Sequence, residues 1–150
     1  MKSSKKVTPQ LEKTGVLMTD RKKLKKVCDN LWTEVIKARA NYQSELSGIK
    51  GKKAGGNAII TAHHIAGKPN TRLRFELANG ICLVNGSEHI FGVHSKDPAK
   101  AREYQDRIIE KIGQKTYDWL LTLRHETTKP DYNLIKLYLE QQFAEYRRVK

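Results

Sequence analysis

The sequence is poor in cysteine and has no long apolar run. Its two cysteines, Cys28 and Cys82, lie 54 positions apart, so they can build neither a disulfide framework nor a cysteine-rich zinc site. We expect both to be small buried apolar groups. No apolar run approaches the roughly 18 residues of a transmembrane helix, and no apolar segment of a secretory signal follows the N-terminal lysines. These absences favour an intracellular protein without a membrane partner.

Two common catalytic arrangements are also missing. There is no glycine-rich phosphate loop, and Gly51, Gly55 and Gly56 fit no nucleotide-binding fingerprint. There is no Ser/His/Asp arrangement either. The length of 150 residues suits one compact domain plus a tail. We assign residues 1–18 to a basic disordered arm and residues 19–150 to a single domain.

Positive charge is the dominant feature that is present. The chain has 29 Lys and Arg against 16 Asp and Glu, a formal charge of +13. Residues 1–26 contribute +7 and residues 48–75 contribute +6, so the rest of the chain is neutral overall. A charge excess of this size indicates an anionic partner, and nucleic acid is a better match than a membrane surface. The second window surrounds a polar cluster, as expected for a phosphate-handling site.

Apolar periodicity predicts a mostly helical chain with a small amount of extended structure, an α+β fold. Helices are expected from Thr19 or Asp20 to about Leu46, over 97–113, over 116–124 and over 130–147. Extended segments are expected over 57–65, 72–76 and 81–84, with a turn at Asn79-Gly80 and a short helix capped by Ser87.

Histidines are concentrated in the middle of the chain. Four of the five lie between positions 63 and 94, namely His63, His64, His89 and His94. Adjacent side chains on a strand point to opposite faces, so His63 and His64 can take separate roles, one on a metal and one on a water. A hairpin followed by a helix brings the strand end near His89. Neutral imidazoles with open coordination positions suit a hydrolytic metal site, and an imidazole also suits a general base near neutral pH.

The segment AHHIAGKPNTRLRFELANGICLVNGSEHIFGVH, residues 62–94, resembles the HNH (His-Asn-His, ββα-metal) nuclease motif. The resemblance rests on the histidine pair, on Leu-Arg-Phe before Asn-Gly, on the short apolar strand and on the histidine-bearing helix. Residues 102–120 are similar to the region that follows the motif in phage recombination endonucleases of the Rap (NinG) type. The resemblance implies a small ββα-metal hairpin-and-helix core over 57–95, followed by C-terminal helices over 97–147.

The resemblance also implies roles for individual residues. His63 and His89 would be metal ligands, and His64 would be the general base that activates water. Asn79 would hold the loop and orient the base, or approach the metal. His94 is a candidate third ligand or phosphate contact, although five residues is a poor spacing for sharing a helical face with His89. The implied cofactor is one divalent ion, Mg²⁺ or Mn²⁺ first and Zn²⁺ or Ni²⁺ next.

The sequence departs from the HNH pattern at the zinc knuckle, where many members have four cysteines. The corresponding places are Ser44 and Ser47, then Val84 and Ser87 or, in a register shifted by one, Asn85 and Glu88. We therefore expect no structural zinc, and packing by the N-terminal and C-terminal helices in its place. The same choice of register puts Glu88 or His89 at the last ligand position, and the imidazole ligand of the family favours His89.

Basic residues on both sides of the histidine pair are the expected DNA contacts. They are Lys50, Lys52, Lys53, Lys68, Arg72 and Arg74. The leading hypothesis is a divalent-metal-dependent DNA endonuclease or nickase that acts on duplex or branched DNA in phage-type recombination, repair or packaging. It would work in the cytoplasm, the host cytoplasm if phage-encoded. The alternatives are a non-catalytic nucleic-acid-binding module that retains the fold, and a protein partner or inhibitor with a basic surface. The preferred DNA structure and the oligomeric state stay open.

Overall fold

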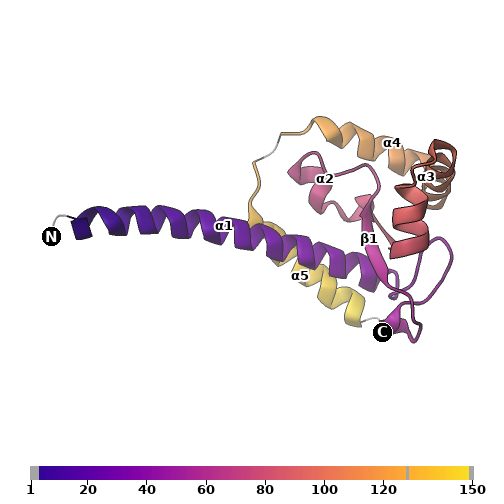
Figure 1. The fold of residues 1–150 in the computed structure, drawn as a ribbon, viewed down its shortest axis with the longest axis horizontal. Coiled ribbons are helices and arrows are strands. Elements are labelled where there is room, and N and C mark those ends of the chain that lie inside the picture. The colour runs from indigo at the N-terminus through magenta and orange to yellow at the C-terminus, as the bar shows by residue number, and fades with distance from the viewer. Residues whose placement is uncertain (1–3, 128, 149–150) are drawn as a thin grey trace.

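The computed structural model describes residues 4–127 and 129–148, with side chains described from Asp20 onward. Its helices and strands are α1 (Ser4–Arg39), β1 (Ile60–His64), α2 (Thr71–Phe75), β2 (Gly80–Val84), the π-helix η3 (Asn85–Val93), α3 (Pro98–Ile112), α4 (Gln114–Thr122) and α5 (Tyr132–Arg148). Short 3₁₀ turns cover Lys52–Ala54, Leu77–Asn79 and Leu123–His125. The chain is thus mostly helical with one two-stranded antiparallel sheet, which confirms the α+β class (Figure 1).

The long helix α1 forms the spine of the molecule, and α5 packs along its C-terminal half (Figure 1). The main core cluster contains Cys28, Trp32, Val35, Ile36 and Ala40 of α1, together with Phe75, Cys82, Tyr132 and Leu139. The two helices are also tied by the Cys28 thiol, which donates to the carbonyl of Tyr132 at 3.3 Å where α5 begins. Both cysteines are free and fully buried, as expected for small apolar groups.

The N-terminal helix differs from the predicted one at both ends. It begins at Ser4, so the segment expected as a disordered arm over 1–18 is helical from Ser4, while residues 1–3 lie outside the described residues. It ends at Arg39 instead of Leu46, because Asn41 and Tyr42 both adopt a positive φ of 56° and turn the chain. The part of α1 before α5 begins projects away from the body (Figure 1).

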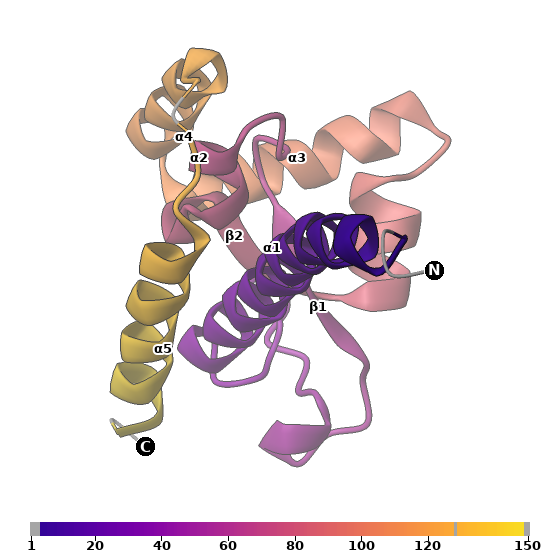
Figure 2. The ribbon, with the colours of Figure 1, turned by 90° about the vertical axis from the view of Figure 1, so that its left-hand side faces the viewer.

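The hairpin of β1 and β2 lies between two layers of helix. Its register pairs His63 with Ile81 and His64 with Gly80. Cys82 packs into the cluster of α1 and α5, whereas the side chain of Ile81 belongs to a second buried cluster with Ile108 of α3. Figure 2 shows α1 end-on with the strands behind it. The hairpin is therefore anchored on both faces, as a two-stranded sheet requires for stability.

The segment between the strands corrects two predictions. Residues 72–76 are not extended but form helix α2, because the side chain of Asn70 caps it by accepting from the Leu73 amide at 2.9 Å. Asn79-Gly80 is not a two-residue hairpin turn, since Gly80 pairs with His64 as the first residue of β2. The glycine is needed for close approach, because a Cβ there would lie 2.3 Å from Cδ1 of Ile36.

The C-terminal helices largely follow the predicted boundaries. Asp97 caps α3 by accepting from the Ala99 amide at 3.1 Å, and Gly113 ends the helix with a φ of 93°. At the start of α5, Asp131 accepts from the Leu134 amide at 3.1 Å. Throughout the described residues, none of the helices combines the length and the apolar character that crossing a bilayer needs.

Hydrogen bonds hold the ends of the hairpin where the resemblance would put a zinc knuckle. Ser44 is buried, and its hydroxyl accepts from the amides of Leu46 and Ser47, both at 3.1 Å. The neighbouring Glu45 carboxylate accepts from the Cys82 amide at 2.8 Å. On the other side, the Glu88 carboxylate accepts from the Val84 amide at 2.6 Å. Polar contacts to the backbone of β2 thus hold the segments that four cysteines hold in the family pattern.

Candidate metal centre

Three imidazoles meet where β1 and the π-helix η3 come together. His63 is near the end of β1, His89 lies within η3 and His94 follows its last residue. The ring centroids are 5.1 Å apart for His63 and His89, 5.4 Å for His63 and His94, and 4.7 Å for His89 and His94. One nitrogen from each ring lies within 4.8 Å of the other two, so the cluster can hold a metal ion. We call it the three-histidine cluster.

The π-helical geometry of η3 explains why His94 belongs to this cluster. In an α-helix, residues five positions apart do not share a face. The sequence prediction assumed an α-helix and therefore ranked His94 below His89 as a metal ligand. In a π-helix the hydrogen bond spans five residues, and the amide of His94 donates to the carbonyl of His89 at 2.9 Å. That turn sets the two imidazoles side by side. Such helices are rare, and they often occur at functional sites.

Burial keeps His63 and His89 in the form that binds metal. Desolvation lowers the pKa of His63 to about 3, with further lowering by His89, His94 and His64. Desolvation, followed by the influence of His94, also lowers the pKa of His89. The Nδ1 atom of His89 is buried and has no hydrogen-bond partner. Neutral rings and an unpartnered nitrogen both fit a metal ligand set, since a ligating imidazole must be deprotonated.

The lowered pKa of His63 predicts that the metal-free protein loses stability in mild acid. Between pH 6.5 and about 3 the unfolded chain binds a proton at His63 that the folded chain does not, so acidification favours unfolding. We expect the free energy of unfolding in EDTA to fall by about 2 kcal/mol from pH 7 to pH 5, at about 1.4 kcal/mol per unit below 6.5. Urea unfolding at both pH values measures it. The His63→Asn variant should show a shallower fall; an equally steep one would contradict the assignment.

His64 follows His63 on β1, lines the same cavity as the three-histidine cluster and contacts α1. Its ring stacks on the indole of Trp32, with centroids 3.9 Å apart and planes within 4°. Its Nε2 lies 3.0 Å from the carbonyl oxygen of Arg74, so we assign the proton to Nε2 and the free lone pair to Nδ1. Burial lowers the pKa of His64, and the hydrogen bond to Arg74 opposes this only in part. The ring is therefore oriented and neutral near pH 7.

Asn79 holds the loop that follows His64. Its side chain is fully buried; Oδ1 accepts from the Ala66 amide at 2.8 Å, and Nδ2 donates to the carbonyls of Gly67 and Leu73, both at 2.9 Å. The amide is thus occupied by backbone groups. Of the two roles considered for Asn79, these contacts match loop holding and not an approach to the metal.

The other predicted site residues lie in three different places. Glu88 is outside the three-histidine cluster, because its carboxylate bonds the Val84 amide. Lys68 and Arg74 line the same cavity as the histidines. The loop lysines Lys50, Lys52 and Lys53 lie toward the opposite end of β1, where Lys52 and Lys53 line a separate hollow with Ile60. Lys53 is also 3.7 Å from the carboxylate of Glu34.

The two arginines expected to grip phosphate are engaged within the protein. Arg74 forms a two-pronged pair with Asp29, with Nε and Nη2 at 2.7 and 2.8 Å from the two carboxylate oxygens. Arg72 pairs with Glu76 and lies 3.7 Å from Glu126. Their charges are partly compensated by carboxylates, which weakens the case for them as the main phosphate contacts.

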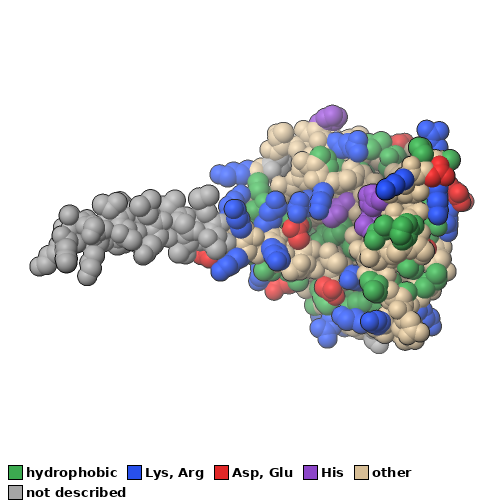
Figure 3. Space-filling view, in the orientation of Figure 1, with side chains coloured by type: hydrophobic (Ala, Val, Ile, Leu, Met, Phe, Trp, Pro, Cys, Tyr) green, Lys and Arg blue, Asp and Glu red, His purple; other side chains and the backbone are tan. Residues whose placement is uncertain are grey.

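The histidines surround a cavity of about 460 Å³ that α1 helps to build. Asp29, Trp32 and Thr33 of α1 contribute to its lining, together with Lys68 and Arg74 on the hairpin side. Figure 3 shows purple imidazoles on this face next to blue Lys and Arg side chains. Sequence reasoning missed the α1 residues, since they lie 30 positions before the motif and read as part of an ordinary amphipathic helix.

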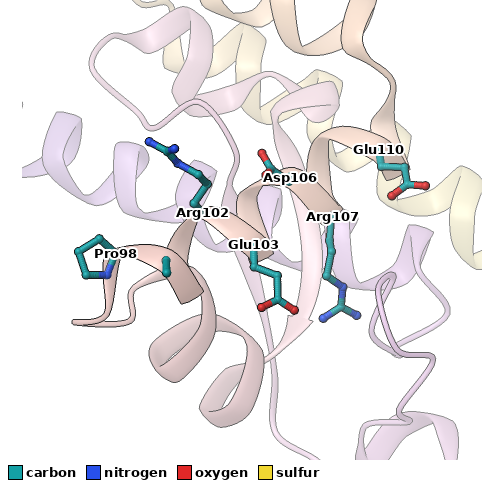
Figure 4. A pocket seen from close by; sticks show the side chains of 7 residues that line it. Pro98, Arg102, Glu103, Asp106, Arg107 and Glu110 are labelled. Atoms are coloured by element: carbon teal, nitrogen blue, oxygen red, sulfur yellow. The ribbon is translucent and has the colours of Figure 1, made fainter.

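A larger hollow, of about 660 Å³, lies elsewhere on the surface. Figure 4 shows that its side chains project from α3, where two arginines lie among three acidic residues. It is lined by Pro98, Ala99, Arg102, Glu103, Asp106, Arg107 and Glu110. Mixed, solvated charges of this kind carry no evident chemistry, so the candidate site remains the histidine cavity.

Comparisons of the chain with protein-family models, with curated proteins and with solved structures give no significant match.

Proposed function

We propose that this protein is a metal-dependent DNA endonuclease or nickase of the HNH class. The observation that carries the proposal is the three-histidine cluster with His64 on the same cavity. Three clustered imidazoles and an oriented fourth imidazole on the same cavity would supply the two functions, a metal ligand set and a base, that hydrolysis of a phosphodiester requires. The order of these residues along the hairpin and helix also matches the family resemblance in the sequence.

The donor set defines which metals suit the site. His63, His89 and His94 would hold the ion, leaving room for water or substrate beside three protein ligands. Imidazoles suit Zn²⁺, Ni²⁺ or Co²⁺, whereas Mg²⁺ prefers oxygen ligands, so we now place these ions ahead of the Mg²⁺ and Mn²⁺ favoured from the sequence. A bound divalent ion supplies Lewis-acid stabilisation of the phosphoryl and leaving oxygens.

His64 would act as the general base. Its Nδ1 lone pair can accept a proton from a water molecule that attacks phosphorus, while Nε2–H stays bonded to the Arg74 carbonyl. Trp32 fixes the ring plane from the side of α1. The hydrogen bonds of Asn79 hold the backbone at Ala66 and Gly67, just after the base. The chain thus orients its base through backbone and helix contacts instead of a carboxylate partner.

The net charge supports DNA as the substrate class. The chain carries +13, and Lys68 adds a cation at the cavity itself. Duplex or branched DNA, in a phage-type recombination, repair or packaging role, remains the proposed context.

Plasmid nicking tests the proposed function. With Zn²⁺, Ni²⁺, Co²⁺, Mn²⁺ and Mg²⁺ supplied separately, we expect EDTA-sensitive cleavage of plasmid or branched DNA, strongest with ions that imidazole binds well. Calorimetry should show one ion per chain, with affinity falling by at least about tenfold in His63→Asn. His125→Asn, which changes an exposed histidine outside the cavity, is the matched control and should bind metal normally.

Two results would count against the proposal. Absence of EDTA-sensitive cleavage of plasmid, branched DNA and RNA with every ion would remove the enzymatic function. Tight DNA binding without metal uptake would favour the non-catalytic nucleic-acid-binding module.

A further inference from the structure

The helix α1 continues past the histidine cavity and carries lysines on the same face. Asp29 and Thr33 of α1 line the cavity. Lys22, Lys25 and Lys26 precede Asp29 by seven, four and three residues. In an α-helix these spacings put side chains on one face. The three lysines, which we call the α1 lysine ridge, therefore extend one wall of the cavity toward the N-terminus.

The α1 lysine ridge has positive charge that no nearby acid compensates. Among the described side chains, none of its lysines is in an ion pair. Asp29, the acid that follows on this face, is already paired with Arg74. Asp20 lies nine residues before Asp29, two and a half turns away, and so points to the opposite side. The ridge therefore presents a net charge of about +3 to solvent.

The ridge is also open to a large ligand. The residues of α1 that face α5 are Leu24, Cys28 and Leu31, which lie on the other side of the helix. From Asp29 to Lys22 the helix rises about 10 Å, at 1.5 Å per residue. That length matches about three base pairs at 3.4 Å each. Lys22 and Lys26 are exposed and Lys25 is partly exposed, so the side of α1 away from the core is accessible to a phosphate backbone.

We propose that the α1 lysine ridge binds the phosphate backbone of duplex DNA on one side of the histidine cavity, with Lys68 on the other rim. Lys68 is exposed, lines the cavity and has no ion pair with any described residue. The choice of DNA as partner rests on the proposed function. The ridge takes the positioning role that the sequence gave to Arg72 and Arg74, whose charges are held by carboxylates.

Binding of the full chain to a labelled duplex, measured in EDTA over a salt series, tests this proposal. EDTA prevents cleavage, so the result does not depend on nuclease activity. The triple variant Lys22→Gln, Lys25→Gln, Lys26→Gln should reduce the slope of log affinity against log salt by about one per lysine, about three in all. Glutamine is a good helix former, so α1 should persist, which circular dichroism checks.

The matched control changes three exposed lysines of α3 and α4, Lys100→Gln, Lys111→Gln and Lys115→Gln, which removes the same formal charge. We expect this control to bind with nearly the wild-type slope. Equal losses in both triple variants would mean that only net charge matters and would overturn the proposal. Unchanged duplex binding in the ridge variant would overturn it as well. A protein that needs the ridge for duplex binding but never cleaves would support the ridge and defeat the nuclease function.

Discussion

Replacing His64 with alanine is expected to reduce the rate of DNA cleavage by about 10²- to 10⁴-fold. The reason is that, in the proposed mechanism, Nδ1 of His64 is the proton acceptor, whereas His63, His89 and His94 would be occupied by the metal. Single-turnover nicking measures the rate. Metal affinity by calorimetry and duplex affinity in EDTA should stay near wild type, because His64 is outside the three-histidine cluster.

Two further readouts separate base catalysis from a structural role of His64. Removal of the ring leaves a space against Trp32, so added imidazole should restore part of the activity of His64→Ala. The wild-type rate should rise with pH and level off below the ordinary pKa of imidazole, since burial lowers the pKa of His64 and a base acts unprotonated. Cleavage by His64→Ala within a few-fold of wild type would refute the assigned role.

The sequence pointed to His63 and His89 as candidate metal ligands and gave His94 only as a possible third one. His63 and His89 could be picked out because a strand end and a following helix place them together. His94 could not be picked out in this way, because its position depends on a π-helical turn. No residue pattern in Asn85–Val93 predicts hydrogen bonds that span five residues. In an α-helix His94 would point away from His89. In the π-helix η3 the two rings are instead 4.7 Å apart.

Charge contacts were the least predictable part. Arg72 and Arg74 were predicted to contact phosphate because they flank the histidine motif. In the fold, Asp29 comes to Arg74 from 45 positions upstream. The same long-range packing of α1 brings Trp32 onto His64. Local sequence patterns cannot predict these long-range contacts of α1. A prediction from the motif alone therefore omits the wall of the cavity that α1 provides.

The extended reading of residues 72–76 failed for a local reason. Alternating Leu73 and Phe75 fit a strand, but both are also buried in a single short helix. Asn70 favours the helix over the strand, because its side-chain oxygen caps the helix. Its side-chain Nδ2 donates to the carbonyls of Leu123 and Arg124 at 2.8 and 3.0 Å. A cap three residues before an ambiguous pattern was the available signal.

The Asn79→Ala substitution is expected to lower the free energy of unfolding by about 3 to 5 kcal/mol. It leaves the buried Ala66 amide and the Gly67 carbonyl without their partner, and the Leu73 carbonyl keeps only the long bond from the Glu76 amide at 3.4 Å. Each unsatisfied group costs about 1 to 3 kcal/mol. Urea unfolding measures the loss. At temperatures where the variant stays folded, cleavage should also fall, because the loop after His64 is no longer held.

The Asn30→Ala substitution provides the control for this prediction, since Asn30 is exposed on α1 and should change stability by no more than about 0.5 kcal/mol. The variant Asn79→Asp adds a sharper comparison. It keeps an oxygen for the Ala66 amide but turns a second oxygen toward the two carbonyls. The loss of free energy of unfolding in this variant should become smaller as the pH is lowered, because the carboxyl then gains a proton to donate. If Asn79→Ala lost less than about 1 kcal/mol and cleaved normally, this asparagine would not be what holds the loop after the base.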